Sequence, residues 1–166
     1  MMNQDRQEGR KKKDVLCTTE RLVVRRFVQS DLKELYKLLS DPEVMAFLEP
    51  PYTYEQAERF MWEAALTELP LVYAVEDREE QFLGYVIYHG YGKDSVELGW
   101  VLKPSVWDRG YASELTRGLL KESEGRYTSA IIECVPRQEA TKAIARKNGF
   151  CYMETKDGCE IFQKEL

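Results

Sequence analysis

The stretch from residue 97 to residue 112 combines residue types in an order that suits the binding of an anion. Apolar residues before Lys103 indicate a strand, and a helix begins directly after the short loop that ends at Gly110. The first backbone N–H groups of a helix have no acceptor within the helix, and the helix dipole favours negative charge beside them. Gly110 and Ala112 permit a ligand to approach the backbone closely, and Arg109 adds positive charge. The pattern predicts a pyrophosphate site, while the alternative of an ordinary glycine turn stays open.

Two common nucleotide-binding loops are excluded by the same residues. A Walker loop requires Gly-x-x-x-x-Gly-Lys followed by Ser or Thr, and a Rossmann loop requires three spaced glycines after a strand. Neither pattern occurs in the chain. An anion beside Gly110 would therefore be held in another way.

Hydrophobic spacing predicts the elements that position this stretch. Apolar residues recur at helical spacing near residues 31–41, 53–64, 112–120 and 137–148, with Thr53 as a candidate N-cap and Gly149 as a helix end. Runs rich in branched and aromatic residues predict strands at 21–27, 71–75, 82–88, 95–102, 129–135, 150–155 and 159–163. This order indicates a mixed α/β domain, in which the strand–helix–strand unit 95–135 should cross over right-handed.

Three segments of the chain resemble one family, the GCN5-related N-acetyltransferases. Residues 107–112, Trp-Asp-Arg-Gly-Tyr-Ala, resemble its acyl-CoA loop, usually written Arg/Gln-x-x-Gly-x-Gly/Ala. Residues 136–150 are similar to its Asn-x-x-Ser … Lys-x-Gly-Phe signature, and residues 19–25 resemble its first strand. The resemblance covers about residues 17–162. Trp at the first loop position, with Gly-Tyr-Ala after it, is similar to the branch that acetylates the N-termini of ribosomal proteins.

The resemblance implies both a fold and an activity. The expected fold class is α/β (α+β), with a splayed, mostly antiparallel mixed sheet and helices on both faces. The expected activity is direct transfer of an acetyl group from acetyl-CoA to a primary amine, either a protein N-terminus or a small molecule. The alternative is a non-catalytic acyl-CoA-binding or regulatory protein of the same fold. Two departures favour that alternative: Gln138 replaces the signature Asn, and Ala145 replaces a Tyr that serves many relatives as general acid.

The resemblance also assigns residues to the acyl donor. The backbone of residues 100–102 would pair with the pantetheine arm, and a backbone N–H near Val101 would stabilise the thioester oxyanion. The loop amides from Asp108 to Ser113 would hold the pyrophosphate. The full set expected to bind acetyl-CoA is Trp100, Val101, Leu102, Trp107, Asp108, Arg109, Gly110, Tyr111, Ala112, Ser113, Gln138, Thr141 and Lys147.

Two residues are candidates for catalysis. In acetyl transfer the ammonium group must lose a proton before it attacks, and the departing thiolate must gain one. Glu97 is the candidate base, acting directly or through water, and its alternative is an exposed strand carboxylate or an ion pair. Thr141, which matches the family's Ser, is the candidate donor to the CoA sulfur, and its alternative is an ordinary helix-surface Thr.

Length and composition limit the class of protein. The chain has 166 residues and a formal net charge of −5, which fits one domain and argues against a nucleic-acid partner. No apolar run approaches the ~18 residues that span a membrane, so we expect no membrane partner. Residues 1–14 are basic and poor in apolar residues, so we expect a poorly ordered tail before a single domain at 15–166.

The cysteines and the single histidine predict neither a metal site nor a nucleophilic thiol. The four cysteines form no Cys-x-x-Cys pair, and zinc sites need clustered ligands. His89 has no partner near it in the sequence, so we expect a loop histidine. Scattered thiols favour the reducing cytoplasm. The oligomeric state, monomer or homodimer, stays open.

Charge is spread unevenly along the chain. Residues 41–97 carry thirteen acidic against three basic residues, a net of −10, whereas residues 98–166 sum to +1. The resemblance places part of the acidic segment around the acceptor. We therefore expect a cationic acceptor, either a small molecule or a basic peptide N-terminus, although a merely solvated acidic surface is the alternative.

Overall fold

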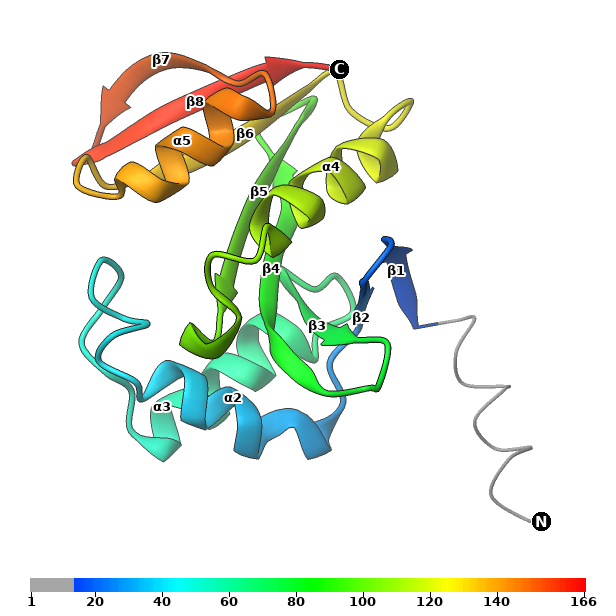
Figure 1. Cartoon of the computed structure of the whole chain (residues 1–166), viewed down its shortest axis with the longest axis vertical. Helices are drawn as coiled ribbons and strands as arrows, with labels where there is room; N and C mark the ends of the chain where they lie inside the picture. The colour runs from blue at the N-terminus through cyan, green and yellow to red at the C-terminus, as the bar shows by residue number, and fades with distance from the viewer. Residues whose placement is uncertain (1–13) are drawn as a thin grey trace.

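A computed structural model describes residues 14–166 of the chain. The tail predicted for residues 1–14 lies outside the described residues, apart from Asp14. One sheet runs through the whole described part, with helices against both of its faces (Figure 1). The strands are β1 (Val15–Thr18), β2 (Leu22–Arg25), β3 (Val72–Asp77), β4 (Phe82–Tyr91), β5 (Ser95–Leu102), β6 (Ser129–Cys134), β7 (Cys151–Lys156) and β8 (Cys159–Glu165). The helical segments are η1 (Gln29–Asp31), α2 (Leu32–Leu39), α3 (Tyr54–Phe60), η2 (Met61–Ala65), η3 (Pro104–Val106), α4 (Tyr111–Ser123) and α5 (Glu139–Lys147).

The sheet divides where β5 meets β6. Its strand order is β1-β2-β3-β4-β5-β6-β8-β7, and every neighbouring pair is antiparallel except β5–β6. That parallel pairing covers only three positions, from Ser95 opposite Ser129 to Glu97 opposite Ile131. Beyond Glu97, β5 continues alongside β4 while β6 diverges from it, as Figure 1 shows. The expected splayed, mostly antiparallel sheet is confirmed.

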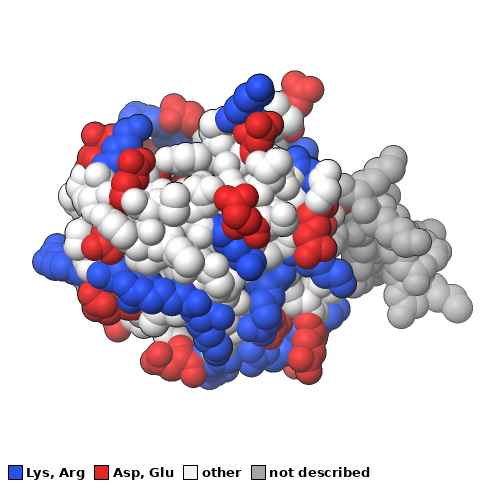
Figure 2. Space-filling model, turned by 90° about the horizontal axis from the view of Figure 1, so that it is seen from above, with Lys and Arg blue, Asp and Glu red and all other residues white. Residues whose placement is uncertain are grey.

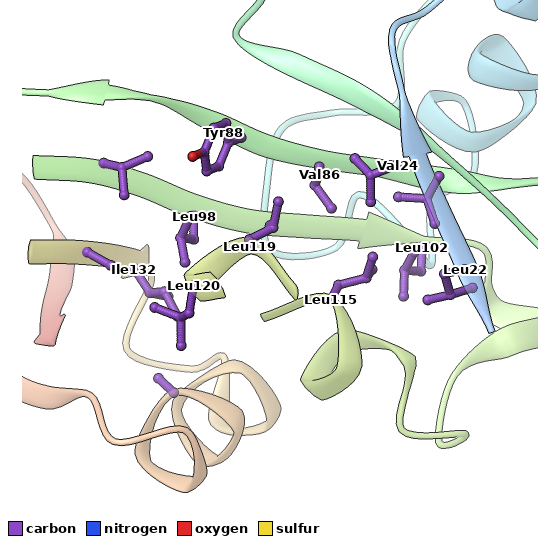
Figure 3. Packing of buried hydrophobic residues seen from close by; sticks show 14 of the residues in the cluster. Leu22, Val24, Val86, Tyr88, Leu98, Leu102, Leu115, Leu119, Leu120 and Ile132 are labelled. Carbon is purple, nitrogen blue, oxygen red and sulfur yellow. The ribbon is translucent and has the colours of Figure 1, made fainter. Parts of the chain in front are cut away.

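Two hydrophobic clusters hold the helices on opposite faces. Alternate residues of β4 and β5 serve each cluster, because successive side chains of a strand point to opposite faces. Val86, Leu98 and Leu102 pack with Leu115 and Leu119 of α4 (Figure 3). The residues between them in the strands, including Tyr85 and Val101, pack instead with α2 and α3. β5 is therefore held from both sides, and its position relative to α4 is fixed.

Some elements of the structure differ in their bounds from the predicted ones, and others agree. The strand predicted at 21–27 is shorter in the structure, where β2 covers only Leu22–Arg25. An edge strand that was not predicted, β1, pairs with it. β1 was missed because its four residues are too few to show an alternation of apolar and polar side chains. The predicted N-cap is confirmed: Thr53 accepts a hydrogen bond from the backbone of Gln56, whose side chain bonds back to Thr53. Gly149 follows α5 with a φ of +88°, as expected of a residue just after a helix.

The described residues also bear on the remaining compositional predictions. No helix among residues 14–166 is long and apolar enough to cross a membrane. The four cysteines are free thiols. No group of three or more His, Cys, Asp or Glu side chains within this part of the chain is arranged to hold a metal ion.

Candidate functional site

The end of β5 presents a free backbone edge. Residues 98–102 pair with β4 on one side, from Leu98 opposite Tyr88 to Leu102 opposite Gly84. On the other side the pairing with β6 has already ended at Glu97. Trp100, Val101 and Leu102 therefore lie where an extended molecule with amide groups is able to add to the sheet through backbone hydrogen bonds. This is the position expected for the pantetheine arm.

The loop after β5 leads this edge to the N-terminus of α4. Asp108 and Gly110 have φ angles of +60° and +79°, so the backbone turns sharply before the helix begins. No side chain caps α4, whose N-cap is Gly110. The first turn closes when the N–H of Glu114 donates to the carbonyl of Gly110 at 3.0 Å. The four amides from Gly110 to Ser113 therefore have no acceptor within the helix, which is the arrangement that binds phosphate groups.

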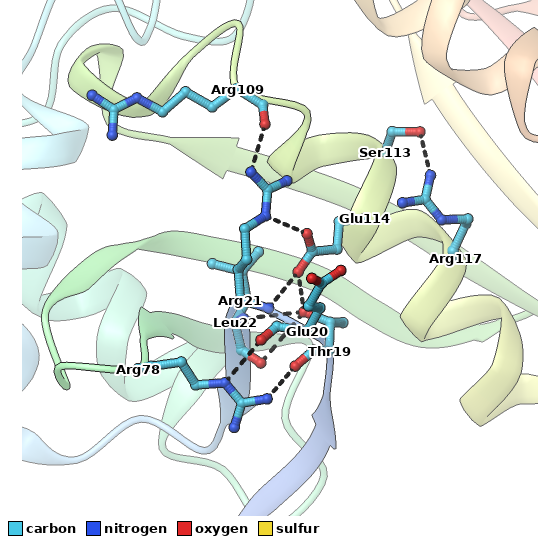
Figure 4. A network of polar contacts seen from close by, with 9 residues as sticks. All are labelled: Thr19, Glu20, Arg21, Leu22, Arg78, Arg109, Ser113, Glu114 and Arg117. Carbon is cyan, nitrogen blue, oxygen red and sulfur yellow. Dashed lines mark hydrogen bonds and ion pairs between the residues drawn. The ribbon is translucent and has the colours of Figure 1, made fainter.

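Arg21, at the turn between β1 and β2, anchors this helix start (Figure 4). Its Nε donates to Glu114 at 2.7 Å and its Nη1 donates to the carbonyl of Arg109 at 2.9 Å. The guanidinium carbon lies 4.3 Å from the centre of the Tyr111 ring. Glu114 also accepts from the backbone of Arg21 and from the hydroxyl of Thr19. Burial opposes the ionisation of Glu114, but these hydrogen bonds outweigh it and lower its pKa.

Substitution of Arg21 by Met should weaken both the fold and the grip on an anion. The change removes two charge-assisted hydrogen bonds, and because the Arg21 side chain is 43% exposed we expect a loss of about 1–2 kcal/mol in unfolding free energy. Urea denaturation and calorimetric titration with CoA measure the two effects. Arg126→Met is the control. It removes the pair of Arg126 with Glu122, a residue of α4 like Glu114, and because that pair is exposed the change should affect stability little.

The same network gives a pH signature. Because the folded pKa of Glu114 is lowered, the stabilisation is present above the ordinary value of 4.5 and is lost as the pH falls through the folded pKa. The stability difference between wild type and Arg21→Met should therefore shrink in acid. A difference that stayed constant from pH 7 to pH 3 would contradict this assignment.

Trp107 occupies the first position of the loop but keeps its polar hydrogen within the protein. Its indole Nε1–H donates to the carbonyl of Leu102 at 2.8 Å. The family pattern has Arg or Gln here, and the indole has no second donor with which to replace them. Trp107 thus closes the loop onto the end of β5 and keeps no side-chain N–H free for an anion. Asp108, Arg109 and Gly110 are all exposed, and the Arg109 side chain points away from the Arg21 network (Figure 4).

The C-terminus of α5 lies beside the start of α4. The Asn148 side chain donates to Ser113 Oγ at 3.1 Å, and Arg117 donates to the same oxygen at 3.0 Å. The hydroxyl of Ser113 is therefore used in joining two helices, which leaves its backbone N–H as its contribution to the anion site. Lys147, the last residue of α5, is exposed and precedes Asn148 in the chain.

The start of α5 departs from the expectation for Gln138. Its Oε1 accepts a hydrogen bond from the backbone N–H of Val135 at 2.9 Å, so the side chain stabilises the turn between β6 and α5. Thr141 lies on α5, partly exposed, and its hydroxyl has no hydrogen-bond partner among residues 14–166. Ala145 is fully buried in the core. The helix position at which many relatives have a Tyr therefore supplies no acid in this chain.

Glu97 is paired rather than isolated, and an ion pair was one of the alternatives that the sequence left open for it. Its Oε2 lies 3.0 Å from Nε2 of His89, directly opposite on β4. The expectation of a partnerless loop histidine was therefore wrong: His89 lies within β4, and only the strand register brings it to Glu97. A hairpin turn that begins at Gly92 places Tyr91 opposite Ser95 and, two residues further along each strand, His89 opposite Glu97. The pair could therefore have been predicted from the register of this hairpin.

The connection between α2 and α3 reaches across to the other half of the sheet. The Arg137 guanidinium, in the turn before α5, lies 5.8 Å from the centre of the Phe47 ring. Phe47 and Leu48 are 43% and 46% exposed. The α2–α3 connection therefore meets the turn before α5, across the divergence of β5 and β6.

The acidic residues of the segment 41–97 lie in different parts of the structure. Glu76 is paired with Arg25, and the turn at 77–80 lies beside the β1–β2 turn, where Arg78 donates to the carbonyls of Thr19 and Glu20. Glu49 lies on the α2–α3 connection and accepts a hydrogen bond from Tyr52. Figure 2 shows Lys and Arg side chains gathered in a band along one side of the molecule seen from above, with Asp and Glu scattered among them. The acidic residues of this segment therefore form no single surface.

Comparison with known proteins places these features in context. Residues 21–151 match the family model described as an acetyltransferase (GNAT) domain. An uncharacterized N-acetyltransferase, YnaD, of Bacillus subtilis is 28% identical over 136 residues, which is 80% of each chain. An acetyltransferase structure from Bacillus anthracis superposes with a TM-score of 0.79 at 23% identity, covering 90% of this chain and 96% of the other. The ribosomal L7/L12 alpha-N-protein acetyltransferase RimL, in complex with CoA, superposes with a TM-score of 0.72 at 15% identity, covering 92% and 98%.

Proposed function

The chain belongs to the GNAT acetyltransferase family, and from this premise we propose that it transfers the acetyl group of acetyl-CoA directly to a primary amine. The observation that carries the proposal is the continuity of the free edge of β5 with the uncapped N-terminus of α4. One part suits an extended amide-containing arm, and the other suits a pyrophosphate. Acetyl-CoA contains both groups in that order, with the thioester at the far end of the arm.

The donor residues fall into three groups. The backbone of Trp100, Val101 and Leu102 binds the pantetheine arm. The amides from Gly110 to Ser113, with the exposed charges of Arg109 and Lys147, bind the pyrophosphate. Thr141 has a free hydroxyl on α5 and donates to the sulfur. Trp107, Asp108, Tyr111 and Ala112 shape the loop, whereas Gln138 supports it from the β6–α5 turn.

Glu97 is the base in this proposal. It is the last residue of β5 that pairs with β6, so it lies where the two strands diverge, at the end of the free edge farthest from α4. Its side chain is 19% exposed, which leaves it within reach of an incoming amine or of a bridging water. The carboxylate accepts the proton that the ammonium group must lose before its nitrogen attacks the thioester carbonyl.

The acceptor proposed here carries additional positive charge, as a polyamine or a basic peptide N-terminus does. Glu97 and Glu49 contribute negative charge on the acceptor side, and the fold resemblance to RimL fits a protein N-terminus as one form of the acceptor. The proposed location is the cytoplasm, which the four free thiols support.

One assay tests the central proposal. Wild-type protein is mixed with acetyl-CoA and a panel of amines, including spermine and peptides with basic N-termini, and released thiol is measured. We expect thiol release that depends on the amine, together with binding of acetyl-CoA in calorimetry. Tight binding without amine-dependent release would favour the alternative of a non-catalytic acyl-CoA-binding protein, to which Gln138 and Ala145 point.

Salt should distinguish a charged acceptor site from a merely solvated surface. Raising ionic strength from about 0.05 to 0.5 M shortens the Debye length to a few ångströms, so the KM for spermine should rise several-fold. Butylamine, which carries one charge, is the matched control and should respond less. Equal responses of the two amines would remove the argument for electrostatic recognition.

A further inference from the structure

His89, the partner of Glu97, is held with both of its ring nitrogens against acceptors. Nε2 lies 3.0 Å from Oε2 of Glu97, across the ladder between β4 and β5. Nδ1 lies 2.9 Å from the carbonyl oxygen of Gly90. The His89 side chain is 26% exposed, so the pair is largely shielded from water while one route to solvent remains.

This geometry gives the pair one well-defined place for a proton. The carbonyl of Gly90 and the carboxylate of Glu97 both only accept, so either tautomer of the neutral ring turns one lone pair toward an acceptor, and in the Nδ1–H tautomer that lone pair is the one on Nε2, facing Glu97. In the protonated ring Nε2–H donates to the carboxylate, and both nitrogens are satisfied. The hydrogen bond to Glu97 raises the pKa of His89, and the bond to Gly90 helps, whereas burial opposes them. A proton therefore resides between Nε2 and Oε2 up to a pH above the ordinary value of 6.5.

The charged neighbours of the pair reinforce this behaviour. Glu133 of β6 adds negative charge that also favours protonated His89. Tyr91 of β4 donates to Glu133 at 2.8 Å, and this bond together with burial raises the pKa of Tyr91 to about 12. Glu154 of β7 acts on Tyr91 in the same direction. Tyr91 thus keeps its proton near neutral pH, which leaves His89 to titrate there.

We propose that His89 and Glu97 act as one proton-accepting pair, in which His89 is a positioning residue that stores the proton taken up by Glu97. This inference rests on the proposed function. An N–H bond of the acceptor ammonium breaks, its proton passes to Glu97 and then to Nε2 of neutral His89, and an imidazolium–carboxylate pair remains. The amine forms the C–N bond as the C–S bond breaks, and its second proton goes to the departing thiolate. His89 then releases its proton to solvent, so one proton is released for each acetyl group transferred.

The pair predicts a specific pH profile. Below the pKa of His89 the pair already holds its proton and accepts no other, so kcat should rise with pH through that pKa. A carboxylate acting alone ionises near pH 4.3, so its rising limb would lie well below neutrality. The position of the limb therefore separates the pair from Glu97 alone.

The single histidine of the chain makes the pair directly observable. In the untagged protein one set of imidazole signals reports the His89 pKa by NMR. We expect a pKa above 6.5 in the wild type that coincides with the rising limb of kcat, and a pKa that falls toward or below about 6.5 in Glu97→Gln. A His89 pKa that Glu97→Gln leaves unchanged overturns the inference.

The pH dependence of kcat in His89→Gln tests the same pair by kinetics. The Gln amide still donates to Glu97 but does not titrate, so the rising limb should move to lower pH. The plateau of kcat should fall about tenfold, less than the ~10²–10⁴-fold effect of a whole general base, because Glu97 remains. Its KM for acetyl-CoA should equal that of the wild type, which also checks folding. A limb that stays in place in this active variant refutes the inference alone, whereas a wild type without amine-dependent thiol release refutes the proposed function and the inference together. The NMR titration and the wild-type profile need no variant, so a His89→Gln that fails to fold leaves the test intact.

Discussion

Replacement of Glu97 by Gln is expected to lower kcat for amine acetylation by about 10²–10⁴-fold, the range over which a positioned general base acts. Gln has nearly the same shape as Glu and is still able to hydrogen-bond to His89, so the β4–β5 ladder should stay intact. What the variant loses is the basic oxygen that receives the ammonium proton. Its affinity for acetyl-CoA should be unchanged, because the donor is held by backbone groups beyond Glu97.

Two measurements define this outcome. Thiol release at saturating acetyl-CoA gives kcat, and calorimetry gives the dissociation constant of acetyl-CoA. Glu165→Gln is the matched control, because Glu165 is a strand carboxylate on β8 that accepts from Gln163 and lies outside the site. A Glu97→Gln variant with wild-type kcat would show that the proton leaves the amine by another route.

Substitution of Gly84 by Ala should cost about 3 kcal/mol or more of unfolding free energy. Gly84 of β4 pairs with Leu102 and has a φ of +149°, which side chains rarely adopt. A Cβ at this position would lie 2.1 Å from the carbonyl oxygen of Val101 and 2.9 Å from the Cα of Leu102. Backbone strain and steric overlap each cost about 1–3 kcal/mol, and neither is relieved by a side-chain movement because the atoms met are backbone.

The same change should also weaken acetyl-CoA binding in any protein that remains folded, because Val101 and Leu102 form the edge proposed for the pantetheine arm. Urea denaturation measures the stability change, and calorimetry measures the binding. Gly90→Ala on the same strand is the control, since a Cβ there meets no atom within 4 Å and should change stability by no more than about 0.5 kcal/mol. Equal stability of the two variants would show that β4 relaxes away from β5.

The predictability of the site differed between its two halves. The donor half is local in sequence: a strand, a turn at Gly110 and a helix follow one another within residues 97–112, so their order alone indicated an anion site. The other half, where the α2–α3 connection meets the turn before α5, is assembled from distant segments. The contact of Phe47 with Arg137 joins parts of the chain 90 residues apart, and no periodicity indicates it.

The distribution of charge likewise depends on contacts between distant segments. Summation over residues 41–97 gave one strongly acidic segment, but the fold pairs Glu76 with Arg25 and places the turn at 77–80 beside β1 and β2. Linear distance was a poor guide because β3 and β4 carry their hairpin turn away from the divergence of β5 and β6. What remains near the divergence of β5 and β6 is a smaller number of carboxylates, among them Glu97.

By itself the sequence determined the order of the helices and strands other than β1, indicated an anion site at a helix start and carried the family resemblance, because hydrophobic periodicity, capping and turn residues act between near neighbours. Only the tertiary structure decided that Arg21 anchors α4 through Glu114, that Gln138 is committed to its own turn, and that His89 faces Glu97. The physical reason is that these contacts depend on strand register and on the packing of α4 and α5 against one face of the sheet. Register and packing are set by many weak contacts summed over the whole domain, and no short segment contains them.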